Sequence, residues 1–431
     1  MSDISFVRTE MLPEKEPPAG ERGIVKWMRT NLFSNWVNSI LTIVAIYVLY
    51  AALSHILPWF LNSIWRADSL TECREIRDAV NNGEPSACFA VITERWSQLI
   101  FGFYPQHLYW RPIVAFVLLF VALAPVLYDT VPRKLFMFTA IYPFLMVWLI
   151  WGGSIWGPLM VVAGFGVGYL AFRALSAVSG LVAIIAAFVA PVIWWLFFGG
   201  LVGDALKSII PLAIESVESR SLGGFTISVI IGISGIALSL PLGIVLALGR
   251  QSDMPFVKYM CIGFIEFIRG VPLITLLFTA LLLLNYFLPK GTNFDVVIRV
   301  IIMVTLFAAA YMAETIRGGL AALPKGQYEA ADSLGLNYWQ AQRLIIMPQA
   351  LKISIPSIVG IFIGLFKDTT LVIFIGISEM LGFTNLIRAN TAWNGVYWEL
   401  FIFVGLVFWI CCFSMSRYSQ WLERKLQTDH H

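Results

Sequence analysis

The chain carries little charge for its length. Only 13% of its 431 residues are charged, whereas 59% are hydrophobic. A soluble globular protein carries about 25% charged residues, so this composition excludes that class and indicates a polytopic membrane protein. The net charge is only +3, and no basic cluster is interleaved with aromatic residues. A nucleic-acid partner is therefore excluded.

Patterns for metal or nucleotide binding are also missing. The four His and five Cys are scattered without ligand spacing. No G-x-x-x-x-G-K-[ST] segment occurs, so the chain does not bind ATP by that route. We expect it to hold no metal and no cofactor of its own. The polar start, Met1 to Arg22, lacks the short apolar core that a cleaved signal peptide needs.

Long apolar runs are abundant. Ten of them are long enough to cross a hydrocarbon core of about 30 Å as helices. They are Trp36–Asn62, Pro112–Tyr128, Leu135–Gly153, Trp156–Phe172, Gly180–Leu201, Phe225–Gly249, Tyr259–Leu288, Val296–Ile316, Ala350–Ile377 and Trp398–Met415. We therefore predict an all-α, polytopic integral membrane protein with about ten transmembrane helices.

The Lys and Arg residues predict the orientation of these spans. Arg22, Lys26 and Arg29 precede the first span, which places the N terminus in the cytoplasm by the positive-inside rule. Every loop that then falls on the inner side is basic. Ten spans with both termini in the cytoplasm are consistent with this charge distribution.

A polar segment rich in small residues interrupts the apolar pattern. It includes Gln327, Tyr328, Glu329, Ala330, Ala331, Asp332 and Gly335, and Ile345, Met347 and Pro348 follow. Pro324 is suited to a helix start and Gly335 to a left-handed helix end, which predicts a short helix between them. Glu329 and Asp332 share a face of that helix, and the two alanines let another surface approach closely. The alternative is a solvated helical hairpin.

This segment resembles the EAA loop of ABC importer permeases. The loop pattern reads E-A-A, three residues, G, nine residues, I-x-L-P, and only Met347 departs from it. Five ordered pieces resemble the polar amino-acid (His/Glu/Gln/Arg) permeases of this class. They are GGFTISVIIGISGIALSLPLGIVLALGR, EFIRGVPL, AAYMAETIRGGLAALPKGQYEAADSLG, KDTTL and LERKL. The resemblance covers about half of the chain and implies a five-helix permease core with an EAA-type coupling loop over residues 223–427.

The preceding residues are not part of a minimal five-span permease. Residues 1–35 read as a cytoplasmic segment, and residues 36–222 as a family-specific membrane region with five helices and a periplasmic loop. This enlargement resembles the M-type subunit of the general L-amino-acid or glutamate/glutamine/aspartate permeases of Gram-negative bacteria.

The resemblance also implies a function and partners. It implies a permease subunit, not an enzyme, in the bacterial inner membrane. Polar L-amino acids (glutamate, glutamine, aspartate, asparagine or a broader set) would move from periplasm to cytoplasm. The expected partners are a second, different permease subunit, two copies of a cytoplasmic ATPase that holds ATP and Mg, and a periplasmic amino-acid-binding protein. The ATPase would dock on the EAA-type segment.

Charged residues inside predicted spans are costly and are therefore candidates for function. Glu266 and Arg269 lie three residues apart, just before Gly270 and Pro272, which are expected to break the helix. Broken helices often form transporter substrate sites.

Span nine contains a second polar group, Asp368 with Thr369 and Thr370, and Glu314 and Arg317 end span eight. Arg269 would meet a substrate carboxylate, Asp368 an ammonium group, and the threonines would supply hydroxyls. A straight helix places Arg269 about 15 Å into its span. The alternative is that these charges form structural ion pairs, or that they are interfacial anchors with the Lys and Arg side chains extended toward the membrane surface.

Two of the cysteines, Cys73 and Cys88, fall in the predicted outside loop between residues 66 and 110. Because the periplasm is oxidising, we predict a disulfide between them; the alternative is two free thiols. Cys261, Cys411 and Cys412 lie in predicted spans and are expected to pack as small apolar residues.

Two other functions fit a polytopic chain. An ion-coupled secondary transporter would hold coupling carboxylates at mid-membrane and often shows internal repeats, but the sequence has no visible repeat. An intramembrane enzyme would need a nucleophile paired with a base, or a metal cluster, and no such pairing is visible.

Overall fold

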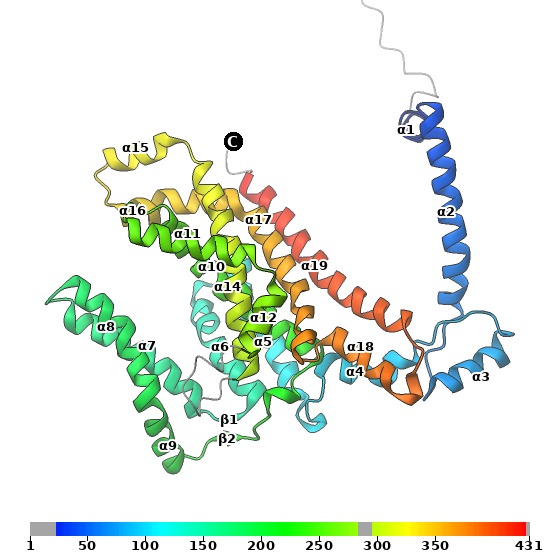
Figure 1. The fold of residues 1–431 in the computed structure, drawn as a ribbon, viewed down its shortest axis with the longest axis horizontal. Coiled ribbons are helices and arrows are strands. Elements are labelled where there is room, and N and C mark those ends of the chain that lie inside the picture. The colour runs from blue at the N-terminus through cyan, green and yellow to red at the C-terminus, as the bar shows by residue number, and fades with distance from the viewer. Residues whose placement is uncertain (1–22, 283–294, 428–431) are drawn as a thin grey trace, which may run out of the picture. The chain divides into compact units, whose positions relative to one another are not determined.

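The computed structural model describes residues 23–282 and 295–427, and nearly all regular structure in these ranges is helical (Figure 1). Nine of the described helices are long and apolar enough to cross a membrane, and the number rises to ten if one bent helix pair is counted as a single span. The prediction of an all-α chain with about ten spans is therefore confirmed. The chain forms two compact units, which divide after Ala90.

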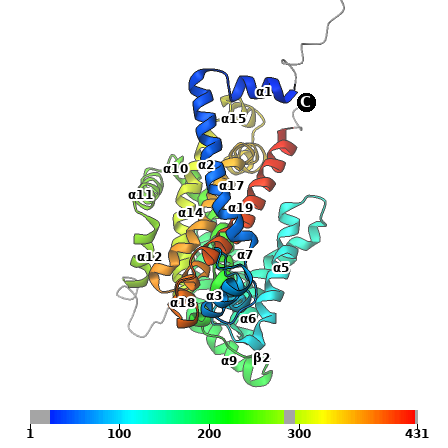
Figure 2. The same ribbon diagram turned by 90° about the vertical axis from the view of Figure 1, so that its right-hand side faces the viewer.

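The first unit contains α1 (Gly23–Asn31), α2 (Trp36–Leu61) and α3 (Leu70–Val80). Asn35 begins α2 as its N-cap, because its side chain accepts a hydrogen bond of 2.8 Å from the backbone N–H of Asn38. Figure 2 shows α1 turning away from the axis of α2.

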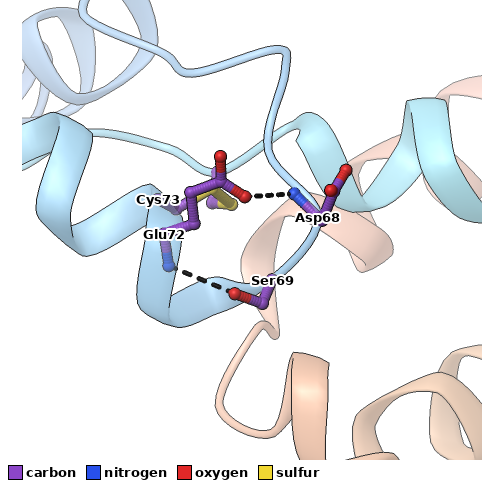
Figure 3. Close-up of a disulfide and its surroundings, with 5 residues drawn as sticks. Asp68, Ser69, Glu72 and Cys73 are labelled. Atoms are coloured by element: carbon purple, nitrogen blue, oxygen red, sulfur yellow. Dashed lines mark hydrogen bonds between the residues drawn. A yellow bond between two sulfur atoms is a disulfide. The ribbon is translucent and has the colours of Figure 1, made fainter.

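A disulfide between Cys73 and Cys88 closes the segment after α2, as the sequence predicts; the two Cα atoms are 6.0 Å apart. Ser69 caps α3 by accepting a hydrogen bond from the backbone N–H of Glu72, and the Glu72 carboxylate accepts one from the backbone N–H of Asp68 (Figure 3). Together these contacts fix the first turn of α3 next to the disulfide.

The second unit begins within α4 and holds the remaining elements. Before residue 223 these are α4 (Ala90–Phe101), α5 (Trp110–Leu127), α6 (Phe136–Trp151), β1 (Gly153–Ser154), α7 (Trp156–Leu175), α8 (Gly180–Ile193), α9 (Gly199–Ile209) and β2 (Ala213–Ile214). After it come α10 (Gly224–Arg250), α11 (Pro255–Gly270), α12 (Leu273–Leu282), α14 (Val296–Ala321), α15 (Lys325–Ser333), α16 (Tyr338–Ala341), α17 (Met347–Asp368), α18 (Met380–Ala389) and α19 (Trp398–Gln427). The two short strands pair antiparallel.

Small residues bring α10 close to its neighbours in the core of this unit. A Cβ atom added to Gly243 would lie 2.6 Å from Cβ of Met312 on α14, and one added to Gly235 would lie 2.9 Å from Val304. Glycine at such positions lets membrane helices approach closely and gain dispersion contacts. The pair α10–α14 forms the centre of the bundle.

The helices before residue 223 share this core. The buried cluster contains Leu149 and Ile150 of α6 together with Ile227 and Ile231 of α10. Thr226 also donates a hydrogen bond of 2.9 Å to the carbonyl of Ile100. Helices on both sides of the division near Leu222, which was inferred from the family resemblance, therefore share one core.

The seventh predicted span is broken where the sequence places Gly270 and Pro272. Helices α11 and α12 meet there at an angle of 102°. The predicted end of this span, Leu288, lies outside the described residues. Figures 1 and 2 show α15 at one end of the bundle, with α18 and the strand pair at the other.

Candidate functional site: a docking hairpin and a charged cluster

Helix α15 is held firmly against the rest of the unit. Gln327 accepts a hydrogen bond of 2.9 Å from Gln349 at the start of α17. Tyr328 packs against a buried apolar cluster that includes Ile316 and Leu323, and burial raises the pKa of its hydroxyl. Ala331 is only 1% exposed. These three residues form the inner face of the helix.

The outer face of α15 is open. Glu329, Ala330 and Asp332 are all exposed, and the two carboxylates lie three residues apart on one face, as predicted. The expectation that both alanines receive a partner needs correction for Ala331. It is buried by its own chain, because it lies three residues after Tyr328 on the inward-facing stripe.

Gly335 ends the helix in the left-handed conformation, with φ of 71°. Its N–H donates to the carbonyl of Asp332, and the N–H of Leu336 donates to the carbonyl of Ala331. This is the Schellman arrangement of a helix C terminus. A Cβ atom at Gly335 would meet no atom within 4 Å, so glycine is favoured there by backbone conformation and not by lack of space.

The next helix begins two residues later. Asn337 accepts from the backbone N–H of Gln340, and the Gln340 side chain accepts from the backbone N–H of Asn337, which is a capping box. Helix α16 then continues through a π-helical turn, Gln342–Ile346, into α17. We call residues 325–341 the docking hairpin. The C-terminal end of α15 and the N-terminal end of α16 are thus both fixed by local hydrogen bonds.

Five charged side chains meet where α10, α11 and α14 come together. They are Arg250, Glu266, Arg269, Glu314 and Arg317, and we call them the arginine–glutamate cluster. Nη1 of Arg250 lies 2.8 Å from Glu266 and 3.3 Å from Glu314. The predicted pair of Glu266 and Arg269 is present but long, at 3.9 Å. The structure therefore supports ion pairing for these residues.

Arg269 is incompletely satisfied within this cluster. Its Nη1 lies 3.9 Å from Glu266 and 3.9 Å from Glu314, too far for hydrogen bonds. Its Nε is buried and has no hydrogen-bond partner among the described residues. The guanidinium lies over the ring of Tyr311, 5.6 Å from its centroid. Arg269 therefore has hydrogen-bond donors to spare.

A hollow of about 260 Å³ adjoins Tyr311. Residues of α14 and α17 line it, among them Phe307, Tyr311 and Asp368. Tyr311 thus contacts the Arg269 guanidinium and also lines the hollow that contains Asp368. The two predicted substrate residues, Arg269 and Asp368, are thus linked through one aromatic side chain.

Thr369 and Thr370 do not share this position. The Thr369 hydroxyl is buried and donates to the carbonyl of Phe366 at 2.7 Å. The Thr370 hydroxyl donates to the carbonyl of Lys367 at 2.9 Å. Both hydroxyls are thus used by their own turn of helix, and the hollow is lined without them.

The expected position of Arg269, about 15 Å into a straight seventh span, stays a prediction about its depth in the membrane. Helix α11 ends one residue after Arg269, at Gly270, and the chain then turns by 102°. Arg269 shares Glu266 with Arg250, the last residue of α10. In Figure 1, α11 lies toward the end of the bundle that carries the docking hairpin.

The sequence analysis missed two members of this site. Neither Arg250 nor Tyr311 is among the candidate residues named from the sequence. Arg250 is separated by 16 residues from Glu266 and by 64 from Glu314, so no local spacing signals these contacts. In the described residues, no group of three or more His, Cys, Asp or Glu side chains is arranged to hold a metal ion.

The chain matches a protein family over its C-terminal part and individual known proteins over its full length. Residues 239–428 match the family described as binding-protein-dependent transport system inner membrane component. The glutamate/glutamine/aspartate/asparagine transport system permease protein BztC of Rhodobacter capsulatus is 57% identical over 433 residues, which cover 100% of both chains. The inner membrane amino-acid ABC transporter permease protein YhdY of Escherichia coli is 39% identical over 406 residues, 93% of each chain.

Among solved structures, a chain in the crystal structure of an amino acid ABC transporter with histidines is 28% identical. The match covers 46% of this chain and 90% of that one, with a TM-score of 0.41.

A multi-pass helical bundle with this full-length similarity defines a membrane permease of the ABC importer class. The chain belongs to the family of amino-acid ABC transporter permeases. It is accordingly a transporter subunit of the inner membrane and not an enzyme. Permeases of this family work with a separate ATPase and a substrate-binding protein.

Proposed function

We propose that the chain carries polar L-amino acids from the periplasm to the cytoplasm, with glutamate, glutamine, aspartate and asparagine as the first candidates and a broader set as an extension. The 57% identity with BztC over the full length supports this range. The chain itself holds no cofactor in this proposal. ATP and Mg reside on the partner ATPase.

The docking hairpin is the proposed contact with that ATPase. The observation that carries this assignment is a stiff helix whose inner face is anchored and whose outer face is polar and open. Glu329 and Asp332 would meet cationic groups of the ATPase, and Ala330 between them leaves room for close approach. The hairpin would act as a lever, because its anchored inner face would pass a movement of the ATPase to α14 and α17.

The proposed assembly has two permease subunits, this chain and a different homologous one, and two copies of the ATPase. Both termini are assigned to the cytoplasm. Lys26 and Arg29 near the start of the chain support this by the positive-inside rule. At the other terminus, α19 ends with Arg424 and Lys425, at the end of the bundle where α15 lies (Figure 1).

The proposed substrate path runs past Tyr311. Every amino-acid substrate carries a carboxylate and an ammonium group, so its site needs opposite charges held apart. Arg269 lies over the Tyr311 ring and offers unused donors, and Asp368 lines the hollow that Tyr311 also borders. The arginine–glutamate cluster holds three arginines and two carboxylates, so a substrate carboxylate would balance its charge.

A transport assay tests the proposed substrate range. The chain would be reconstituted with its partner permease, ATPase and receptor, and uptake of glutamate, glutamine and an apolar amino acid would be compared. We expect ATP-dependent uptake of glutamate and glutamine. Uptake of the apolar amino acid alone would contradict the proposed substrate class.

A further inference from the structure

Glu314 is shared by arginines from three helices. Its Oε1 accepts a hydrogen bond of 3.0 Å from Nε of Arg317, one turn further along α14. Its Oε2 lies 3.3 Å from Arg250 of α10 and 3.9 Å from Arg269 of α11. Removal of this carboxylate would leave three guanidinium groups with one remaining acid, Glu266.

The position of Glu314 connects the cluster with the docking hairpin. Glu314 lies seven residues before Ala321, where α14 ends, and α15 begins at Lys325. The helix that carries Glu314 therefore leads directly into the lever. The ion pair between Glu314 and Arg269 of α11 restrains the end of α14 that leads into the docking hairpin.

The ion pair with Arg269 is the weakest of the three ion pairs that Glu314 makes with arginines. At 3.9 Å it is a charge contact without a hydrogen bond, whereas Arg317 and Arg250 approach Glu314 within hydrogen-bonding distance. A free carboxylate that binds a guanidinium through two parallel hydrogen bonds interacts more strongly than such a contact. A substrate carboxylate would therefore displace Glu314 from Arg269 and leave the other two contacts in place.

We propose that Glu314 is a positioning residue that competes with the substrate carboxylate for Arg269. Without substrate, Glu314 holds the Arg269 guanidinium between α14 and α11. When substrate takes Arg269, Glu314 is released from α11, and the end of α14 that carries the docking hairpin loses one restraint. This inference rests on the proposed role of Arg269 in substrate binding.

The test is Glu314→Gln in the reconstituted complex, with the substrate concentration at half-maximal uptake measured separately from the maximal rate. Loss of a competing, partly exposed charge is expected to lower that concentration about threefold. ATP hydrolysis without substrate is expected to rise, because the restraint on α14 is already absent. A purely structural role would lower the maximal rate or the yield of complex without lowering the half-saturating concentration.

A second variant guards against loss of assembly. Glu314→Asp keeps the cluster's charge but shortens the side chain by one methylene, so its contacts across to the other helices weaken while the acid remains near Arg317. It is expected to shift half-saturation in the same direction by a smaller factor. Asp129→Asn is the matched control. It breaks a 2.8 Å ion pair with Lys425 that involves no residue of the cluster, and it should leave half-saturation unchanged.

Arg269→Gln separates this inference from the proposed function. Suppose that Arg269→Gln raises the half-saturating concentration while neither Glu314 variant lowers it. Arg269 then binds substrate, but Glu314 does not compete with substrate for it, and the inference is wrong. If Arg269→Gln leaves that concentration unchanged, the substrate role of Arg269 fails, and the competition fails with it. The double variant Glu314→Gln with Arg269→Gln should match Arg269→Gln alone, because no guanidinium remains to compete for.

Discussion

Nε2 of Gln349 donates a hydrogen bond of 2.9 Å to Oε1 of Gln327, which ties α15 to the start of α17. The same α17 ends at Asp368, which lines the hollow. On its other side, α15 follows α14, which carries Glu314 and Tyr311. The docking hairpin is thus joined to both walls of the hollow through single helices, which would couple the proposed ATPase contact to the proposed substrate path.

Gly335→Leu is expected to uncouple transport from ATP hydrolysis. A branched side chain opposes the left-handed conformation at this position and costs about 1–2 kcal/mol there, so the helix end of the lever would rearrange. Substrate-stimulated ATPase activity of the assembled complex is the measurement. Gly335→Asn is the matched control and should retain most coupling, because asparagine tolerates the left-handed region. Full stimulation in the leucine variant would contradict the lever.

Ala331→Leu is expected to lower the stability of the permease, whereas Ala330→Leu is expected to weaken ATPase binding. Ala331 is 1% exposed, so a larger side chain there overpacks the inner face and costs about 1–3 kcal/mol of stability. Ala330 is exposed, so its replacement should leave the melting temperature of the permease unchanged and weaken ATPase binding. Melting and ATPase co-purification, measured on both variants, test this. Equal effects on both measurements would show that the two faces are assigned wrongly.

The bridge between Cys73 and Cys88 is expected to stabilise the segment that it closes by about 3 kcal/mol in the chain-entropy model. Mass mapping of peptides under non-reducing conditions should recover the two cysteines in one linked species. The double variant Cys73→Ser with Cys88→Ser should be cleaved faster by a protease added from the periplasmic side. Two separately alkylated cysteines in the native protein would refute the pairing.

Asp368→Asn is expected to weaken substrate binding. The carboxylate lines the hollow beside Tyr311, and a neutral amide would lose the attraction to the substrate ammonium. Half-saturation for uptake should rise by about tenfold, since a charged hydrogen bond is worth about 1.5–3 kcal/mol before screening reduces it. Thr370→Val is the matched control and should have little effect, because that hydroxyl serves the carbonyl of Lys367. Unchanged half-saturation and maximal rate in Asp368→Asn would remove this residue from the substrate path.

Glu379 predicts a pH dependence of stability. Its side chain is 0% exposed and caps α18 through hydrogen bonds from two backbone N–H groups. Burial raises the pKa of its carboxyl from 4.5 to about 7, although those two bonds act in the opposite direction. The folded state therefore binds this proton more tightly than the unfolded state. Its contribution to stability is present below pH 4.5 and is lost as the pH rises through about 7.

Glu379→Gln should remove this part of the pH dependence. The melting temperature of the purified protein would be measured at pH 5.5 and pH 8 for both forms. The wild type is expected to lose more stability than the variant between these two values. The exposed Glu218 supplies the control, Glu218→Gln, which should follow the wild type. Parallel curves for wild type and Glu379→Gln would contradict a buried, protonated Glu379.

Features with local causes could be predicted from the sequence. Gly335 marks the helix end because few other residues adopt its backbone conformation, and Gly270 and Pro272 mark the break after α11 because proline cannot donate the hydrogen bond that a continuing helix needs. The pairing of Cys73 with Cys88 followed from their shared loop and an oxidising compartment. Each inference needed only neighbouring residues and the side of the membrane.

Features that depend on packing could not be predicted in the same way. The inward position of Ala331 depends on which stripe of α15 meets the apolar cluster. The contacts of Arg250 with Glu266 and Glu314 join three helices, and helical spacing contains no information about such partners. The threonines after Asp368 were expected at the substrate, but their hydroxyls bond to the backbone of their own turn.

The measurement that tests the central claim most directly is uptake of radiolabelled glutamate into proteoliposomes that contain this chain, its partner permease and the ATPase. Accumulation is predicted only when the receptor is present on the outer side and ATP on the side of the docking hairpin, with no response to an imposed proton or sodium gradient. Accumulation driven by such a gradient without ATP would identify a secondary transporter and contradict the assignment as an ABC importer.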